Sequence, residues 1–246
     1  MRVLAVALAC TASQASAAAV DGQAKPSVVI VHGAFADGSD WSKVIPLLQA
    51  KGVKVTAIQN PLTSLADDVA ATRRAIAAQP GKVVLVGHSW GGTGITEAGQ
   101  HDKLGSLVYV AAFAPAAGKS TIETGEGYPE APGSKRFLAD AEGFVSLPEA
   151  ALREDFAQDV PAAQAAIMTA AQGPIQAKAF SEKVTNAAWT TKPSWFIVAS
   201  RDRMIDPGLQ RAMAQTIHAK TTELLTSHVP QQSRPAEVAK VILDAV

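Results

Sequence analysis

The fold is decided by the stretch Gly87-His88-Ser89-Trp90-Gly91-Gly92. An apolar run, residues 82–86, precedes it, and residues 92–100 can form a helix after it. Between a strand and a helix, a G-x-S-x-G pattern places its serine on a sharp turn, where the crowded neighbours must be small. The turn exposes the hydroxyl at the strand end where α/β proteins bind ligands. The pattern predicts that Ser89 is a nucleophile; the alternative is a glycine-rich turn with an incidental serine.

Composition sets broad limits on the class of protein. The chain has 246 residues, of which 48% are hydrophobic and 18% are charged. These values are typical of one compact domain with room for an insertion. The 22 basic residues equal the 22 acidic ones, so nothing indicates nucleic acid or an anionic membrane as a partner. Beyond the N-terminal region, no apolar run approaches the roughly 20 residues that cross a membrane.

The first residues resemble a removable export signal. Arg2 is followed by an apolar run, residues 3–10, and by the small-residue pattern Ala15-Ser16-Ala17. We predict a signal peptide over residues 1–19 and a periplasmic or secreted protein; a disordered apolar tail would instead leave it cytoplasmic. Cys10 is the only cysteine and would leave with the signal, unless it carries a lipid. The mature chain then has no cysteine ligand or disulfide, and we predict neither a metal nor a cofactor.

Apolar, β-branched runs alternate with helical patterns along most of the chain. Six runs predict strands, at residues 27–31, 53–58, 82–86, 106–111, 194–199 and 221–225. Helices are expected at residues 41–51, kinked at Pro46, and from caps at Ser64, Asp206-Pro207 and Pro235. This alternation predicts an α/β protein, with an approximately six-stranded, mainly parallel sheet covered by helices on both faces.

Residues 115–192 interrupt this alternation of strands and helices, because no run within them predicts a strand. They begin with a glycine-rich stretch and continue as alanine-rich segments at 148–159, 162–172 and 175–184. We predict a mostly helical cap, inserted between core segments 20–114 and 193–246, that roofs the substrate pocket. Most large apolar side chains of the cap are expected to form its own core. The predicted pocket residues are Phe35, Trp90, Phe113 and Trp189.

A serine nucleophile needs a base, and His228 is the predicted one. It lies in a loop after the sixth strand, which opens on the same edge of the sheet as Ser89. The alternative is a solvated loop histidine. His32 and His88 lie in tight turns, where orienting roles are expected. His101 and His218 lie near helix C-termini, where an imidazole can cap carbonyls.

The base needs an orienting carboxylate, and the developing oxyanion needs donors. Asp202 is the predicted carboxylate because it follows the fifth strand, whereas Asp206 is better explained as a helix cap. The chain order Ser, Asp, His is that of α/β-hydrolases. One donor is the backbone N–H of Trp90, directly after the nucleophile. The second is expected in the loop after the first strand, at Ala34 or Phe35.

The chain resembles the α/β-hydrolase superfamily over nearly all of its mature length. More narrowly, it is similar to the serine esterases grouped with plant methyl-ester esterases and hydroxynitrile lyases, in a bacterial branch. The residues that carry the resemblance are 31–35, Trp41, 87–92, 202–205, Ser227-His228, Ser233 and Pro235. The resemblance implies a cofactor-free hydrolase with a Ser89–His228–Asp202 triad and with Ala34 and Trp90 as oxyanion donors.

Two positions distinguish the esterase from the lyase side of this group. The lyases carry a threonine where Gly33 stands and a lysine where Val229 stands, so the esterase side is favoured. The predicted function is hydrolysis of small or flat apolar carboxylic esters through an acyl-enzyme. The alternatives are a non-hydrolytic ligand-binding module of the same fold, or hydrolysis of lactones or carbon–carbon bonds at the same site. The expected partner is a small-molecule ester, and the sequence does not determine the oligomeric state.

Overall fold

The computed structural model describes residues 26–246; the predicted signal, residues 1–19, and Cys10 lie outside them. Within this range a six-stranded sheet has the order β2-β1-β3-β4-β8-β9, and every neighbouring pair of strands is parallel. The predicted α/β-hydrolase sheet is therefore confirmed. The strands are β1 (Ser27–Val31), β2 (Val55–Ala57), β3 (Val83–His88), β4 (Leu104–Val110), β8 (Ser194–Ala199) and β9 (Lys220–Leu224).

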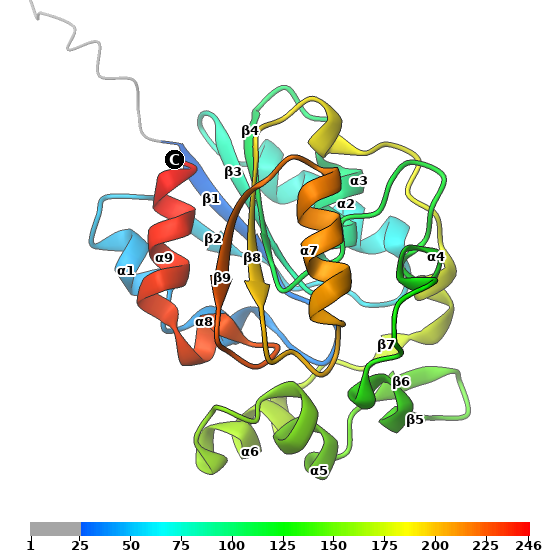
Figure 1. Ribbon diagram of the computed structural model, residues 1–246. Coiled ribbons are helices and arrows are strands. Elements are labelled where there is room, and N and C mark those ends of the chain that lie inside the picture. The colour runs from blue at the N-terminus through cyan, green and yellow to red at the C-terminus, as the bar shows by residue number, and fades with distance from the viewer. Residues whose placement is uncertain (1–25) are drawn as a thin grey trace, which may run out of the picture.

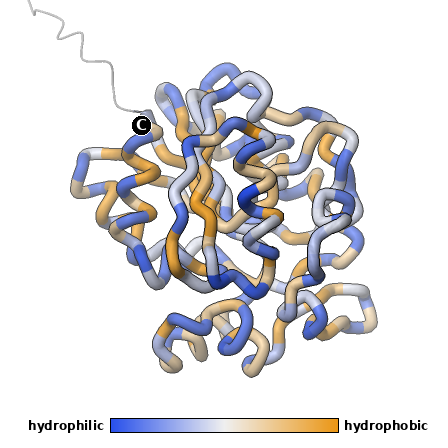
Figure 2. Tube along the Cα trace, in the orientation of Figure 1, coloured by the Kyte–Doolittle hydropathy of each residue, from blue (hydrophilic) through white to orange (hydrophobic). Residues whose placement is uncertain are grey.

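Alternate residues of the strands enter two different cores. Val29 and Val31 pack on the side that also receives α2 (Leu65–Ala77), α3 (Trp90–Ala98) and α7 (Pro207–Thr216). Val28 and Ile30 pack on the other side, with α1 (Ile45–Gln49) and α9 (Pro235–Asp244). Figure 1 shows the helices on both sides of the sheet, and Figure 2 shows hydrophobic residues concentrated in the central strands. Burial on both faces explains why these strands are continuous apolar runs.

Side-chain hydrogen bonds cap the first turns of α2 and α7. The Ser64 hydroxyl accepts the Asp67 N–H at 3.0 Å, and the Asp206 carboxylate accepts the Leu209 N–H at 3.0 Å. The prediction of a single helix over residues 41–51 is wrong. The chain instead forms a 3₁₀ helix (Gly38–Trp41) and then α1, with Pro46 in its first turn. A proline is tolerated there because the first-turn N–H groups have no partner within the helix.

Residues 115–192 connect β4 to β8 and are called the connecting segment below. Its elements are α4 (Thr121–Gly125), 3₁₀ helices Pro132–Arg136, Ala177–Ser181 and Ala188–Thr190, β5 (Leu138–Ala139), β6 (Phe144–Ser146), α5 (Glu149–Ala151), the π-helix Leu152–Phe156, α6 (Ala162–Ala171) and β7 (Ile175–Gln176). The three strands form an antiparallel sheet. The expectation of a segment without strands was therefore wrong, as was the helix expected at residues 175–184. Strands of two or three residues are too short to show alternation in the sequence.

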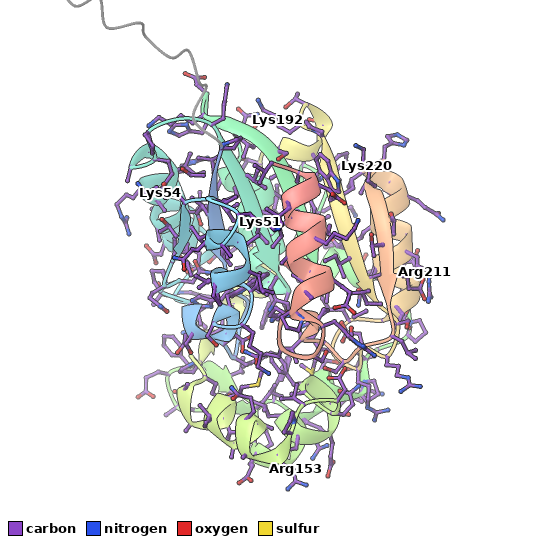
Figure 3. All side chains as sticks on the ribbon, turned by 90° about the vertical axis from the view of Figure 1, so that its left-hand side faces the viewer. Lys51, Lys54, Arg153, Lys192, Arg211 and Lys220 are labelled. Carbon is purple, nitrogen blue, oxygen red and sulfur yellow. The ribbon has the colours of Figure 1, made fainter. Side chains whose placement is uncertain are left out.

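Much of the connecting segment lies at the carboxyl ends of the sheet strands. In Figure 1, the arrowheads of β8 and β9 point towards the part of the molecule that contains α5 and α6. Among residues 26–246, no helix is both long and apolar enough to cross a membrane. Figure 3 labels six basic side chains; Lys51 lies over the middle of the face in view, and the other five are spread around the outline of the molecule. These six side chains therefore do not form one basic patch.

Candidate active site

Ser89 lies between β3 and α3 in a strained backbone conformation. Its φ is 52° and its ψ is −124°, a combination that costs a non-glycine residue about 1–3 kcal/mol. Neighbouring backbone holds it there. The Ser89 N–H donates to the Val110 carbonyl at 3.3 Å, and the Ser89 carbonyl accepts the Phe113 N–H at 3.2 Å. The end of β4 thus fixes the turn that presents the serine.

The glycines after Ser89 are required by close approaches of other backbone. A Cβ on Gly91 would lie 2.4 Å from the Val31 carbonyl oxygen, and one on Gly92 would lie 2.2 Å from the Phe113 carbonyl oxygen. Both contacts are with backbone, which cannot turn aside as a flexible side chain can. The ends of β1 and β4 therefore crowd the serine turn as the sequence pattern predicts.

His228 and Asp202 form a buried pair in the loops that follow β9 and β8. His228 Nδ1 lies 2.7 Å from Asp202 Oδ2, and the two side chains are 1% and 0% exposed. Because a carboxylate accepts hydrogen bonds, this contact places the imidazole proton on Nδ1 and leaves Nε2 able to accept one. The structure thus brings together the two residues that the sequence predicts as base and orienter.

The Asp202 carboxylate is held by three further donors. Its Oδ1 accepts the backbone N–H groups of Met204 at 2.7 Å and Ile205 at 3.0 Å. Its Oδ2 accepts the Gln210 side-chain amide at 2.7 Å, in addition to His228. Each lone-pair direction of the carboxylate therefore has a donor, and the orientation of the carboxylate towards His228 is fixed.

His88 and His32 lie next to the site and are not among the residues that line its cavity. His88 Nε2 lies 2.8 Å from the His228 carbonyl, and the two rings are 4.8 Å apart. Burial holds the pKa of His88 well below its usual range, so the ring is a neutral donor to that carbonyl. His32 Nε2 accepts the Asn60 N–H at 2.8 Å, and its Nδ1 lies 2.8 Å from the Gly33 carbonyl. Both residues thus orient the turns around the site, as their positions in the sequence indicate.

Two backbone N–H groups are available beside Ser89. The Phe35 N–H donates to the Gly173 carbonyl at 3.1 Å, which leaves Ala34 as the candidate donor of that turn. Trp90 is the first residue of α3, and the N–H groups of a first helical turn have no acceptor within the helix. Ala34 and Trp90 both line the same cavity as Ser89.

This cavity has a volume of about 500 Å³ and also contains His228. Phe35 and Phe113, both predicted to line the pocket, do so. Its walls come from the turns after β1, β3 and β4, from the connecting segment, and from the loop after Asp202. The other lining residues are Thr121, Ile122, Gly125, Tyr128, Pro129, Glu130, Ala131, Ser134, Phe137, Ala177, Phe180, Met204, Ile205, Asp206 and Leu209. Most are apolar, so the cavity suits an apolar ligand.

Four aromatic rings form a continuous wall of this cavity. Phe35 and Phe137 are 5.0 Å apart, Phe137 and Phe180 are stacked at 6.4 Å, and Phe180 meets Trp90 edge to face at 5.5 Å. The Trp90 indole N–H donates to the Asp68 carboxylate at 2.7 Å. Burial raises the pKa of Asp68 to about 6, against hydrogen bonds from Trp90 and Leu62. The bond to Asp68 fixes the plane of the Trp90 ring.

Trp189 was predicted to line the pocket, and the structure places it elsewhere. Its indole N–H donates to the Pro115 carbonyl at 3.0 Å. Its ring packs against the core between the sheet and α2, α3 and α7, and it is absent from the cavity lining. Trp189 lies in the last turn before β8, so it follows the chain away from the carboxyl ends of the strands and back to the start of β8.

The polar segment after His228 contacts a buried carboxylate rather than the cavity. The Gln231 side chain donates to Asp40 Oδ2 at 3.0 Å, and the Gln232 side chain donates to the Asp40 carbonyl at 2.6 Å. Burial raises the pKa of Asp40 to about 6, against the hydrogen bonds of the two glutamines. The sequence did not reveal these contacts, because Asp40 lies 191 and 192 positions from the two glutamines, nor did it reveal the contact of Gln210 with Asp202.

Phe156 is a further contact of the site that the sequence did not reveal as such. It lies in the π-helix of the connecting segment, and its ring meets the His228 ring edge to face at 4.9 Å. The sequence predicts only that it belongs to the core of the segment, where it is indeed buried. Across residues 26–246, no three His, Cys, Asp or Glu side chains are grouped to hold a metal ion.

Comparison with known proteins agrees with this geometry. Residues 28–241 match the profile described as the Alpha/beta hydrolase family. The chain belongs to this family. A pyrethroid hydrolase of Sphingobium wenxiniae is 27% identical over 252 residues, which cover 88% of this chain and 86% of the relative. Esterase PIR7B of Oryza sativa is 23% identical, over 91% of this chain and 97% of the relative.

Solved structures of the alpha/beta hydrolase family share the fold. One is described as an extracellular alpha/beta-hydrolase from a Paenibacillus species with homology to tobacco salicylic acid binding protein 2. It superposes with a TM-score of 0.76 at 22% identity and covers 89% of this chain and 98% of its own. The resemblance to esterases of this family, inferred from the motifs, is confirmed, and the chain is a hydrolase.

Proposed function

We propose that this hydrolase cleaves carboxylic esters through an acyl-enzyme formed on Ser89. The observation that carries the proposal is the 2.7 Å contact between His228 Nδ1 and Asp202 Oδ2, in a site where His228 and the strained Ser89 line one apolar cavity. A serine, a buried histidine–carboxylate pair and free backbone N–H groups are the parts that ester hydrolysis without a metal requires.

In both halves of the reaction, His228 carries the proton. Ser89 Oγ attacks the ester carbonyl carbon while His228 Nε2 takes the hydroxyl proton, and the N–H groups of Ala34 and Trp90 stabilise the oxyanion. The tetrahedral intermediate collapses, the C–O bond to the alcohol breaks, and His228 returns the proton to that oxygen. A water then attacks the acyl-enzyme with His228 as base, which releases the acid and restores Ser89.

The substrates best suited to the cavity are esters of small or flat apolar groups. The aromatic wall of Phe35, Phe137, Phe180 and Trp90 offers ring faces and edges along one side of the cavity. Flat aromatic groups pack on such surfaces in offset or edge-to-face contacts. A long, flexible acyl chain would lose more conformational freedom on binding and gain less from these rings.

We also propose that the connecting segment acts as a cap. Phe137 and Phe180, which lie in it, line the cavity and contact Phe35 and Trp90 of the segment 20–114. We therefore assign substrate preference to residues 115–192 and the bond-breaking chemistry to the other two segments. Export is proposed from the N-terminal pattern alone; the relative described as extracellular is in keeping with it. Sequencing the N-terminus of the protein from its native host tests this, because a start at Met1 would contradict it.

The decisive experiment compares initial rates on p-nitrophenyl esters of two to sixteen carbons for the wild type, Ser89→Ala and Ser134→Ala. Ser134 is a matched control because it lines the same cavity but its hydroxyl donates to the Ala131 carbonyl. We expect activity to be highest on short chains and to vanish only in Ser89→Ala. A maximum on long chains would overturn the substrate assignment. Saturable binding without turnover, unchanged in Ser89→Ala, would indicate a ligand-binding module instead, and activity restricted to lactones or carbon–carbon bonds would indicate another reaction.

A further inference from the structure

Gln210, on α7, is a fully buried amide in direct contact with the carboxylate of the proposed triad. Its Nε2 donates to Asp202 Oδ2 at 2.7 Å and to the Ile205 carbonyl at 3.1 Å, and its Oε1 accepts the Ala199 N–H at 3.0 Å. The side chain thus connects the last residue of β8 with two points of the loop that carries Asp202.

The two backbone partners fix which way the amide faces. The Ala199 N–H can only donate, so it must meet the amide oxygen. The Ile205 carbonyl can only accept, so it must meet the NH₂ group. A flipped amide would place donor against donor and acceptor against acceptor in a buried position, at a cost of several kcal/mol. The remaining N–H of Gln210 is therefore directed at Asp202.

The oxygen that Gln210 contacts is the one that also contacts His228, and both distances are 2.7 Å. The terminal torsion of an aspartate is broad, so two backbone donors on Oδ1 do not by themselves set the direction in which Oδ2 points. We propose that Gln210 is the positioning residue that aims Asp202 Oδ2 at His228, and that it does so without adding charge beside the histidine. This inference rests on the proposed esterase function of the same site.

Gln210→Glu tests the inference through charge. The variant keeps the size of the side chain and an acceptor for the Ala199 N–H, but it places two carboxyl groups within hydrogen-bond distance. Two carboxyl groups so close share a proton, and any added negative charge favours the protonated form of a nearby histidine. We expect the acidic limb of the kcat/KM profile to move to higher pH by about one unit or more.

Other ionisable groups near the pair stay in place in this variant. His88 and Asp40 are buried and interact electrostatically with His228, and Asp206 caps the start of α7 with its own carboxylate. None of these three side chains bonds to the Gln210 amide, so a shift of the profile reports the new group at position 210. Gln215→Glu is the matched control, because Gln215 lies on the same helix and is exposed. We expect the control to keep the wild-type profile.

Gln210→Met tests the inference through geometry, since it keeps the approximate volume of the side chain and removes both donors. We expect kcat to fall about ten- to a hundred-fold, the loss expected for one hydrogen bond to a charged group, while KM stays near the wild-type value. A purely structural role would lower the melting temperature and the amount of active enzyme, and would leave the pH profile of the remaining activity unchanged.

The rate at which Ser89 releases p-nitrophenol from a p-nitrophenyl alkylphosphonate, in a single turnover, is measured over the same pH range. This readout needs no ester turnover, so it separates failure of the inference from failure of the proposed function. Wild-type profiles in both position-210 variants would overturn the inference. A Gln210→Glu protein that does not fold where the wild type does would also count against it, because the amide would then be a structural requirement.

Discussion

The six-stranded sheet and the connecting segment, residues 115–192, contribute to one site in different ways. The central strands of the sheet are fully buried, and each is joined to its neighbours by backbone hydrogen bonds in register. The segment consists of short helices, a π-helix and strands of two or three residues. Its own backbone ladders are therefore few, and it must be held by other contacts.

Those contacts are side chains that bond to the loops bearing Asp202 and His228. The Asp155 carboxylate accepts a hydrogen bond from Arg136, within the segment, at 2.8 Å. It accepts a second one from Arg203, next to Asp202, at 2.7 Å. Gln158 donates to the Arg201 carbonyl at 2.7 Å, and Asp159 accepts the Ser227 N–H at 2.8 Å. The sheet thus places the proposed catalytic residues, whereas the segment holds their loops and supplies much of the cavity wall. The two regions should respond differently to substitution.

The largest expected effect separates chemistry from stability. Ser89→Ala removes the proposed nucleophile, and we expect kcat to fall by about 10⁴–10⁶. The melting temperature should stay within a few degrees, because the contacts of the elbow are made by backbone atoms. Ester hydrolysis and thermal unfolding followed by circular dichroism measure the two quantities. A large loss of stability would show that the serine hydroxyl also holds the turn.

Asp155→Ala should act mainly on the anchoring of the connecting segment. It removes a 1% exposed carboxylate from two arginines that are 33% and 48% exposed. We expect a loss of about 2–3 kcal/mol in the free energy of unfolding, less than for a fully buried pair because water reaches the arginines. Urea denaturation measures it. Glu126→Ala, an exposed carboxylate of the same segment, should change the stability little; equal losses in both variants would contradict the anchoring role.

Asp40→Asn should show how ionisation of the buried Asp40 side chain, which contacts the segment after His228, changes stability with pH. Its pKa is raised from 3.8 to about 6, so the folded state binds a proton more tightly than the unfolded chain does. The stability that this group contributes is therefore greatest below pH 3.8 and falls as pH rises towards 6. The variant cannot ionise. Relative to it, the wild type should lose on the order of 2–3 kcal/mol between pH 4 and pH 7.

Denaturation of both proteins across this range measures the difference. The substitution is tolerable because the side-chain oxygens of Gln231 and Gln232 are buried without a partner in the described chain, so one of these amides can turn and accept a hydrogen bond from the new amide at position 40. A difference in stability that does not depend on pH would show that Asp40 is ionised throughout.

The smallest effect tests the aromatic wall contributed by the segment. Phe180→Leu removes one ring that contacts Phe137 and Trp90. We expect KM for phenyl esters to rise about 3- to 10-fold, the value of one aromatic contact, while KM for butyl esters and both kcat values change little. Phe144→Leu is a control because Phe144 lies in the same segment but outside the cavity lining. Equal changes for both ester types would indicate general loosening.

The sequence predicts the sheet well because its local signals are complete. The runs at residues 27–31 and 194–199 coincide with β1 and β8, and the caps at Ser64 and Asp206 begin α2 and α7 as expected. A strand that is buried on both faces must be apolar throughout, and a capped helix shows its own start. Neither signal depends on the rest of the chain.

The connecting segment was predicted less well because its structure depends on distant partners. The strand β7 at Ile175–Gln176 pairs with β6, far away in the sequence, and Trp189 is placed by a bond to Pro115. For the site, the order and spacing of the motifs predict Ser89, Asp202 and His228 as one group. They could not reveal Gln210 or Asp40, because a buried glutamine or aspartate has no local pattern until the fold supplies its partner.

The bond from His88 to the His228 carbonyl joins residues 140 positions apart in the chain. A long loop has to close before this contact can provide any stabilisation. The Ser89 turn is held by the backbone that ends β1 and β4, and the ribosome makes these strands well before it reaches His228. In the proposed reaction, Ser89 therefore has no base until residue 228 has been made, and we expect a chain truncated before that residue not to cleave esters.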